Sequence, residues 1–84
     1  MDIETIVRRC LCSALGRPHE QAALLNMDDD LTYGYGLASI DRIILMSAAC
    51  RHAGVPLTLL DQDDLAGLRT PADIVHLLSV KAPS

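Results

Sequence analysis

Apolar residues recur at helical spacing in the first part of the chain. They occur every three or four residues, at positions 3, 6, 7, 10, 11, 14 and 15, which is typical of a helix with one buried stripe. Asp2 is placed to cap this helix, and Gly16 with Pro18 beyond it is placed to end it. The pattern predicts a helix over about residues 3–15.

A second apolar run begins at Ser39 and stops before Gly54 and Pro56, which predicts a helix over about 39–52. Its apolar residues are too numerous for one stripe. At about 100° per residue, one side holds Leu45, Met46, Ala49 and Ala53, and the other holds Ile40, Ile43, Ile44, Ser47 and Cys50. Either side could face the core.

Two further helices are expected in the last third of the chain. Acidic residues at the start of the segment 61–66 suit the positive end of a short helix. Thr70, Pro71 and Asp73 combine an N-cap, a first-turn proline and an acid at the third helical position. They predict a helix over about 71–80, whose buried face is expected to hold Ile74, Val75 and Leu78.

Residues 17–38 show no regular pattern, and a connection of this length in a small domain is usually functional. Its apolar residues that are expected to attach it to the core are Leu24, Leu25, Met27 and Leu31. The acidic run 28–30 and the glycines Gly34 and Gly36 are typical of a solvated, conformationally free loop. Because no stretch alternates as a strand does, the sequence predicts an all-α bundle with three main helices, one short helix and a long loop between the first two helices.

Composition narrows the possible functions. The 84 residues are expected to form one domain, 1–84, which is near the lower size limit for an independent core. A formal charge of −4 and seven scattered basic residues argue against a nucleic-acid partner and favour a protein. Three cysteines cannot all pair, and no apolar run approaches membrane-spanning length. These observations favour a reduced, cytoplasmic protein without a membrane segment.

Ser39 is the candidate for chemistry. A serine before a helix is usually an N-cap, but this one follows a loop containing Gly34 and Gly36, and isoleucines follow it at 40, 43 and 44. The setting suggests an exposed hydroxyl that an enzyme can modify.

Other kinds of site fit poorly. A 12-residue calcium loop counted from Asp28 places Tyr33 where glycine is required and Ser39 where the bidentate glutamate belongs. Gly34-Tyr35-Gly36 lacks the flanking residues of a phosphate-binding loop. We therefore expect no metal site, and we expect Tyr33 and Tyr35 to pack within the loop.

Zinc and nucleophilic catalysis are also disfavoured. Two residues apart on a helix, Cys10 and Cys12 point about 200° apart, with Cys10 expected in the core and Cys12 partly exposed. Ser39 and His52 are separated by about 20 Å of helix, so they cannot form a catalytic set. We expect no catalytic residue.

The order of elements resembles the acyl carrier protein family, which includes peptidyl and aminoacyl carriers. The resemblance extends over almost the whole chain and centres on Gly36, Ser39 and Ile40. The family pattern has Asp directly before the serine, whereas this chain has Ala38. Some stand-alone aminoacyl carriers also have a small residue there.

The resemblance implies a four-helix fold and a stand-alone carrier without catalytic activity. Ser39 would bear 4′-phosphopantetheine, transferred from coenzyme A by a phosphopantetheinyl transferase, and the arm would carry an acyl or aminoacyl group as a thioester. Implied partners are an acyl- or aminoacyl-loading ligase and a downstream synthase or transferase. Ala38 leaves open which transferase recognises the chain.

Fatty-acid carriers resemble one another in having an acidic second helix. The second helix predicted here differs, because Asp41 is its one acidic residue. If the side with Leu45 faces inward, Ile40, Ile43 and Ile44 form an apolar patch beside Ser39, and this patch with Arg51 is expected to dock partners. The alternative is that the long loop covers Ile43 or Ile44. The scarcity of acidic residues on this helix favours a role in specialised metabolism, of the polyketide or nonribosomal type, over bulk fatty-acid synthesis.

Two rival interpretations remain open at this point. The chain could be a helical interaction domain in which Ser39 is only an N-cap, or a degenerate carrier that has lost its prosthetic arm, for which Ala38 is the only hint.

Overall fold

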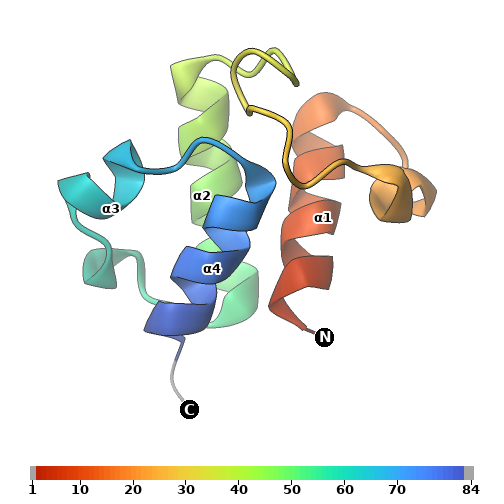
Figure 1. Ribbon diagram of the computed structural model, residues 1–84. Coiled ribbons are helices and arrows are strands. Elements are labelled where there is room, and N and C mark those ends of the chain that lie inside the picture. The colour runs from red at the N-terminus through yellow and green to blue at the C-terminus, as the bar shows by residue number, and fades with distance from the viewer. Residues whose placement is uncertain (1, 83–84) are drawn as a thin grey trace.

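Three helices form the centre of the molecule. In the computed structural model, which describes residues 2–82, α1 spans Ile3–Leu15, α2 spans Ser39–Ala53 and α4 spans Pro71–Lys81. α1 runs antiparallel to α2 and α4, so that α2 and α4 both begin at the end of the molecule where α1 finishes (Figure 1). Within residues 2–82 there is no strand, and the predicted all-α fold is confirmed.

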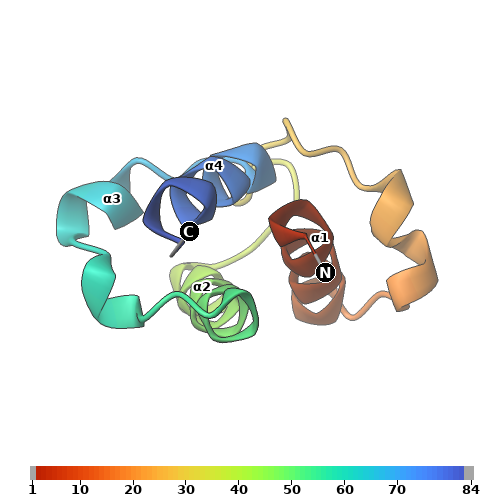
Figure 2. The same ribbon diagram turned by 90° about the horizontal axis from the view of Figure 1, so that it is seen from below.

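Short helical segments flank the three helices on opposite sides. The 3₁₀ helix η1, His19–Leu24, lies beside α1, and the 3₁₀ turn η2, Leu57–Leu59, with the short helix α3, Gln62–Ala66, lies on the far side of α2 and α4 (Figure 2). η1 falls in the segment that was expected to be irregular. η2 falls between the helices predicted over 39–52 and 61–66, where no helix was predicted; Val55 in this stretch is buried.

Side-chain caps begin three of the four α-helices. Asp2 Oδ1 accepts a hydrogen bond from the Thr5 N–H at 2.7 Å, as predicted for α1. Thr70 Oγ1 accepts from the Asp73 N–H at 3.2 Å at the start of α4. Asp61 Oδ1 accepts from the Asp64 N–H at 2.8 Å at the start of α3. The local sequence signals therefore set where these helices start.

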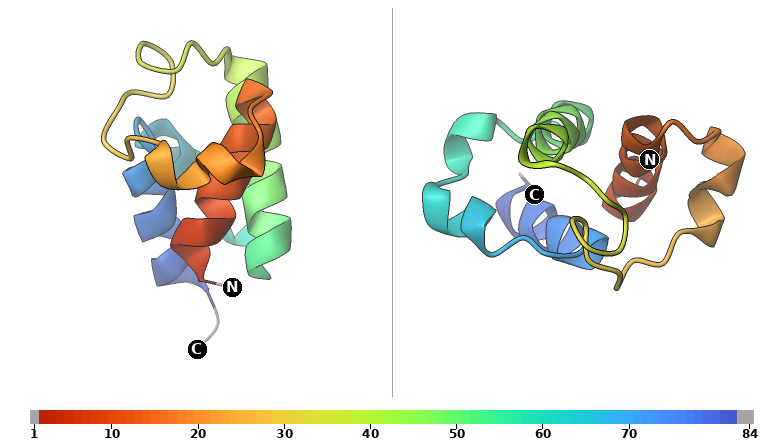
Figure 3. Two further views of the ribbon diagram at one scale, coloured as in Figure 1. Left: turned by 90° about the vertical axis from the view of Figure 1, so that its right-hand side faces the viewer. Right: turned by 90° about the horizontal axis from the view of Figure 1, so that it is seen from above.

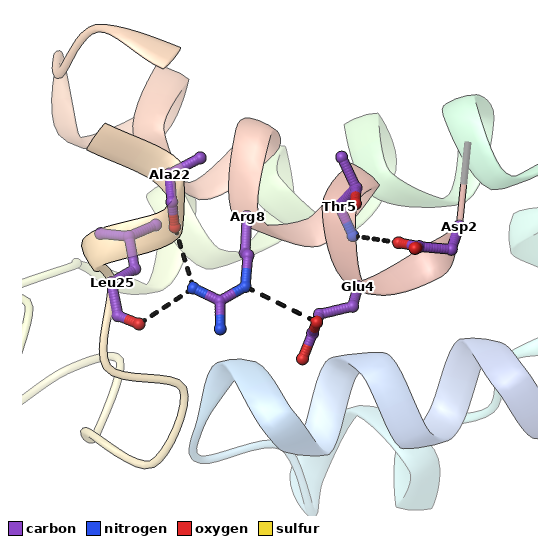
Figure 4. A network of polar contacts seen from close by, with 6 residues as sticks. All are labelled: Asp2, Glu4, Thr5, Arg8, Ala22 and Leu25. Atoms are coloured by element: carbon purple, nitrogen blue, oxygen red, sulfur yellow. Dashed lines mark hydrogen bonds and ion pairs between the residues drawn. The ribbon is translucent and has the colours of Figure 1, made fainter. Parts of the chain in front are cut away.

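α1 is anchored by contacts that periodicity does not reveal. The Arg8 guanidinium donates from Nη1 to the carbonyls of Ala22, at 2.9 Å, and Leu25, at 3.1 Å, while its Nε lies 3.9 Å from a Glu4 carboxylate oxygen (Figure 4). These hydrogen bonds fasten η1 and the residue after it to α1. Leu25 is buried, as expected, but Leu24 is 83% exposed. The expectation that both leucines attach to the core is wrong, because neighbouring residues at the end of η1 point in different directions.

The two cysteines of α1 are placed opposite to expectation. Cys12 is fully buried and Cys10 is half-buried. Cys12 lies one turn after Arg8 and therefore on the same side of α1, the side to which η1 is fastened. The chain folding back over this side buries Cys12, and the apolar spacing within α1 cannot show that.

Candidate functional site

Ser39 is the first residue of α2, and its side chain is exposed. The segment before it crosses the end of the bundle where α2 begins (Figure 3). The N-cap is Ala38, in an extended conformation with φ −75° and ψ 167°. Its N–H donates to Asp41 Oδ2 at 3.1 Å, and its carbonyl accepts from the Arg42 N–H at 3.1 Å. The interpretation of Ser39 as an N-cap is therefore wrong, because Ala38 occupies that position.

The turn before Ser39 has a defined conformation. Gly34 N–H donates to the Asp30 carbonyl at 2.7 Å, and a Cβ added to Gly34 would meet that same oxygen at 2.7 Å. Gly36 has φ +73°, in the left-handed region that favours glycine. Gly34 thus allows a close backbone approach, and Gly36 adopts a left-handed conformation. The expected conformational freedom is not the role of either glycine. Leu31 and Leu37 at the ends of this turn are buried, whereas Tyr33 is 91% exposed, so the expectation that it packs within the loop is wrong.

Hydrogen bonds connect the turn to the start of α4. Leu31 N–H donates to the Arg69 carbonyl at 2.7 Å, and Ala72 N–H donates to the Met27 carbonyl at 2.9 Å. Leu37 N–H donates to the Leu31 carbonyl at 3.0 Å, which closes the turn upon itself. Ser39 is therefore presented by a segment that is attached both to the core and to a neighbouring helix.

A cleft of about 280 Å³ adjoins Ser39. The α2 residues that line it are spaced at i, i+3, i+4, i+7 and i+8 from the serine, so they form one stripe of the helix. The lining consists of Leu31, Ser39, Arg42, Ile43, Met46, Ser47, Leu57, Leu60, Leu65, Leu68 and Ile74. Apart from Ser39, Arg42 and Ser47 it is apolar. The opposite wall comes from η2, α3 and the residues around them.

The isoleucines that follow Ser39 are exposed. Ile40, Ile43 and Ile44 are 61%, 60% and 57% exposed, respectively, so the alternative in which the long loop covers Ile43 or Ile44 is wrong. Arg51 is also exposed, in the last turn of α2. Cys50, expected on the same side as the isoleucines, is instead buried, because it belongs to the face of α2 that packs in the core.

The thiols lie outside the cleft. Burial raises the pKa of Cys10, although the positive charge of Arg51 acts in the opposite direction, and burial also raises the pKa of Cys50. Within residues 2–82, no three His, Cys, Asp or Glu side chains are grouped as metal ligands. No helix in that range is long and apolar enough to span a membrane.

Comparison with known families identifies the class of protein. The family model described as "Phosphopantetheine attachment site" matches residues 5–78, which is most of the chain. The chain belongs to this family of non-catalytic carrier proteins, whose prosthetic group is 4′-phosphopantetheine. Carrier proteins of this kind are modified by phosphopantetheinyl transferases and interact with the enzymes of their pathway. No curated protein and no solved structure matched the chain.

The predicted resemblance to acyl carrier proteins is thereby confirmed, and the interpretation as a simple interaction domain is not supported. Sequence reasoning missed two features of the site. Arg42 was not considered, although its position three residues after Ser39 indicates a shared helix face. The wall formed by Leu57, Leu65 and their neighbours lies in the short helix predicted over 61–66 and in the stretch before it, and neither was considered as part of a site.

Proposed function

We propose that Ser39 is the residue that carries 4′-phosphopantetheine. The observation that supports it most directly is an exposed hydroxyl on the first residue of α2, beside an apolar cleft. The unpaired N–H groups and the dipole of a helix N-terminus favour a phosphate there. Ser47, the other serine of the cleft, lies two turns further along α2 and lacks this setting.

Ser39 acts as the nucleophile in the loading reaction. A bond forms between Ser39 Oγ and the phosphorus of coenzyme A that bears the pantetheine. The pyrophosphate bond of coenzyme A breaks, adenosine 3′,5′-bisphosphate leaves, and the hydroxyl proton passes to a base of the transferase. Within this chain, no ionisable side chain needs to act, because the serine only has to be accessible. When bound, the group supplies a terminal thiol that carries an acyl or aminoacyl cargo as a thioester.

The lining of the cleft suits the arm. Its walls are aliphatic, with Ser39 and Arg42 as polar groups at the end where the arm would be attached. A short acyl group on the arm would find apolar side chains from Met46, Leu57 and Leu65. We propose that a ligase loads an acyl or aminoacyl group and that a downstream synthase or transferase receives it.

The surface of α2 supports a role in specialised metabolism. Asp41 is the one acidic residue of the helix, and its carboxylate already accepts the Ala38 N–H. Fatty-acid carriers resemble one another in having acidic residues on this helix, whereas this chain has exposed isoleucines there. Docking on this surface therefore depends more on apolar burial than on charge, as in peptidyl and aminoacyl carriers.

Intact-protein mass spectrometry tests the attachment. The purified apo chain is incubated with coenzyme A, Mg²⁺ and a broad-specificity phosphopantetheinyl transferase. We expect the wild type to gain the mass of one phosphopantetheinyl group and Ser39→Ala to gain none. Ser47→Ala is the matched control, because it removes another exposed serine of the same helix and cleft. Modification of Ser39→Ala, or no modification with any transferase, would refute the assignment, and the second result would favour a degenerate carrier.

We further propose that Ile40, Ile43 and Ile44 form the surface against which the phosphopantetheinyl transferase docks, with Arg51 at its edge. All three isoleucines lie within two turns of Ser39, so an enzyme that approaches the Ser39 hydroxyl over this side of α2 would cover them. Each is more than half exposed. Complete burial of one isoleucine side chain contributes about 1.5–3 kcal/mol, of which part is available here because each side chain is already partly covered.

Charge substitution tests this surface. Ile43→Glu and Ile44→Glu should each raise the KM of the transferase reaction by about tenfold, if roughly 1.4 kcal/mol of apolar burial is lost. Val80→Glu is the matched control, because Val80 is 65% exposed on α4. Arg51→Glu should have a smaller effect, since Arg51 lies about 18 Å along α2 from Ser39. Equal KM values for Ile43→Glu, Ile44→Glu and Val80→Glu would refute the docking surface.

A further inference from the structure

Arg42 is a cation in an otherwise apolar cleft. It shares that cleft with Ser39 and follows it by three residues on α2, so the two side chains lie on one face of the helix, about 4.5 Å apart along its axis. The remaining lining is aliphatic except for Ser47. Arg42 is half-buried, so its charge has lost part of its hydration, which an anionic partner would replace.

The guanidinium of Arg42 has little compensation within the chain. The ion pairs among residues 2–82 join Arg8 to Glu4 and Lys81 to Asp64, and neither involves Arg42. Its side-chain hydrogen bond runs from Nη1 to the neutral Thr32 Oγ1, at 3.2 Å. A guanidinium has five N–H donors, so most of its capacity to bind an oxyanion is unused.

The charges around Ser39 indicate which anion Arg42 would bind. The carboxylate of Asp41 accepts the Ala38 N–H immediately beside Ser39. A phosphodiester on Ser39 adds a second negative charge at this place, and the helix N-terminus offsets only part of it. Arg42, one turn away and facing the cleft, is the cation in position to offset the rest.

We propose that Arg42 is a positioning residue for the prosthetic arm: its guanidinium pairs with the phosphodiester on Ser39 and directs the arm along the cleft between α2 and the η2–α3 segment. The proposal rests on Ser39 being the attachment residue. The hydrogen bond to Thr32 uses one of the five guanidinium donors, so the others are free to bind the phosphodiester. Because the pair is partly exposed to solvent, the population of arm held in the cleft changes by about two- to fivefold when it is removed.

Nuclear magnetic resonance of the holo protein tests the proposal independently of any carrier activity. Three readouts are used: the ³¹P shift of the phosphodiester, the Nε–Hε signal of Arg42, and nuclear Overhauser contacts from the geminal methyl groups of the arm to the side chains of Ile43 and Leu57. In the wild type, we expect the Arg42 signal to move on conversion from apo to holo. We also expect contacts between the arm and the cleft that weaken as salt is raised.

Variants separate pairing from general charge. Arg42→Gln should shift the ³¹P signal and reduce the arm-to-cleft contacts by about two- to fivefold, while Arg42→Lys should restore part of both. Arg9→Gln is the matched control, since it removes the same charge from an exposed arginine of α1 that lies outside this cleft. Wild-type values in Arg42→Gln, or equal changes in Arg42→Gln and Arg9→Gln, would overturn the proposal.

The outcomes also distinguish this inference from the proposed function. If mass spectrometry shows no phosphopantetheinyl group on Ser39 of the wild type, the attachment and the pairing both fail. If the wild type is loaded but the Arg42 signal does not change between apo and holo forms, only the pairing fails. That comparison needs no variant, so the proposal remains testable even if Arg42→Gln is a poor transferase substrate.

Discussion

Replacing Ala38 by Asp should stabilise the apo protein, because the N-cap of α2 lacks half of a capping box. In α3, Asp61 Oδ1 accepts the Asp64 N–H at 2.8 Å, while Asp64 Oδ2 accepts the Asp61 N–H at 3.1 Å. In α2 the second of these contacts has a counterpart, from Ala38 N–H to Asp41 Oδ2 at 3.1 Å. The first has none, because a methyl group cannot accept a hydrogen bond.

The expected gain follows from the missing acceptor. An Asp or Ser at an N-cap in place of Ala contributes about 1 kcal/mol, and a negative charge at a helix N-terminus adds about 0.3–1 kcal/mol. Repulsion from the Asp41 carboxylate opposes the second contribution, by about 1 kcal/mol at solvent-exposed separations. We therefore expect a net gain of about 1 kcal/mol for both Ala38→Asp and Ala38→Ser, which in a domain of this size raises Tm by about 4–8 °C.

Thermal and urea unfolding followed by circular dichroism measure this gain. Ala23→Asp is the control, because it places the same charge on an exposed alanine of η1, where the change should stay within about 0.5 kcal/mol. In the holo form the gain from Ala38→Asp should fall below that from Ala38→Ser, since the carboxylate then stands beside a phosphodiester. If neither substitution stabilises the apo protein, the Asp41 N–H does not lack an acceptor and the reasoning is refuted.

Four further predictions concern the turn, the α1 anchor, an aspartate and the thiols. Gly36→Ala should destabilise the fold by about 1–2 kcal/mol in urea unfolding, because φ is +73°, and Gly36→Asn should lose less. Arg8→Ala should lower stability by about 1 kcal/mol and speed amide hydrogen exchange in residues 22–25, whereas equal exchange rates in both proteins would contradict the anchoring role. The pKa of Asp73 lies below its ordinary 3.8, chiefly through the hydrogen bond from the Arg69 N–H. The contribution of Asp73 to stability is therefore present above pH 3.8 and is lost as the pH falls through the lowered pKa. Asp73→Asn should flatten the dependence of Tm on pH in this acidic range. Because burial raises the pKa of Cys10, iodoacetamide at neutral pH should show a fast phase only in the holo protein, where the arm thiol is present.

Signals that act within one or two helical turns were readable from the sequence. Asp2, Asp61 and Thr70 each supply a side-chain acceptor to nearby N–H groups, so the chain marks the starts of α1, α3 and α4 by itself. The same locality explains a failure at α2. There Ser39 offered the expected cap residue, but the turn before it places the extended residue at Ala38, so the helix begins at Ser39 itself, one position earlier than it would with Ser39 as its N-cap.

The burial of a side chain was predictable only where the periodicity of its own helix determines it. Leu45, Met46 and Ala49 follow the helical period and are buried, as one of the two expected sides required. Cys12 and Leu24 do not follow expectation, because their burial depends on how residues 17–38 fold back on α1. The three isoleucines after Ser39 were expected either to be exposed or to be covered by that segment, and only its tertiary path shows that they are exposed.

The sequence by itself determined a small all-helical fold with a serine at the start of its second long helix, because periodicity and caps act over short distances along the chain. Its carrier function was indicated by resemblance to a family, through the residues around Ser39, and the family match confirmed it. Only the tertiary structure decided that Ser39 and Arg42 open onto a cleft walled by η2 and α3. Leu57 and Leu65 are far from Ser39 in sequence, and no local pattern encodes which apolar side chains meet across the space between two helices.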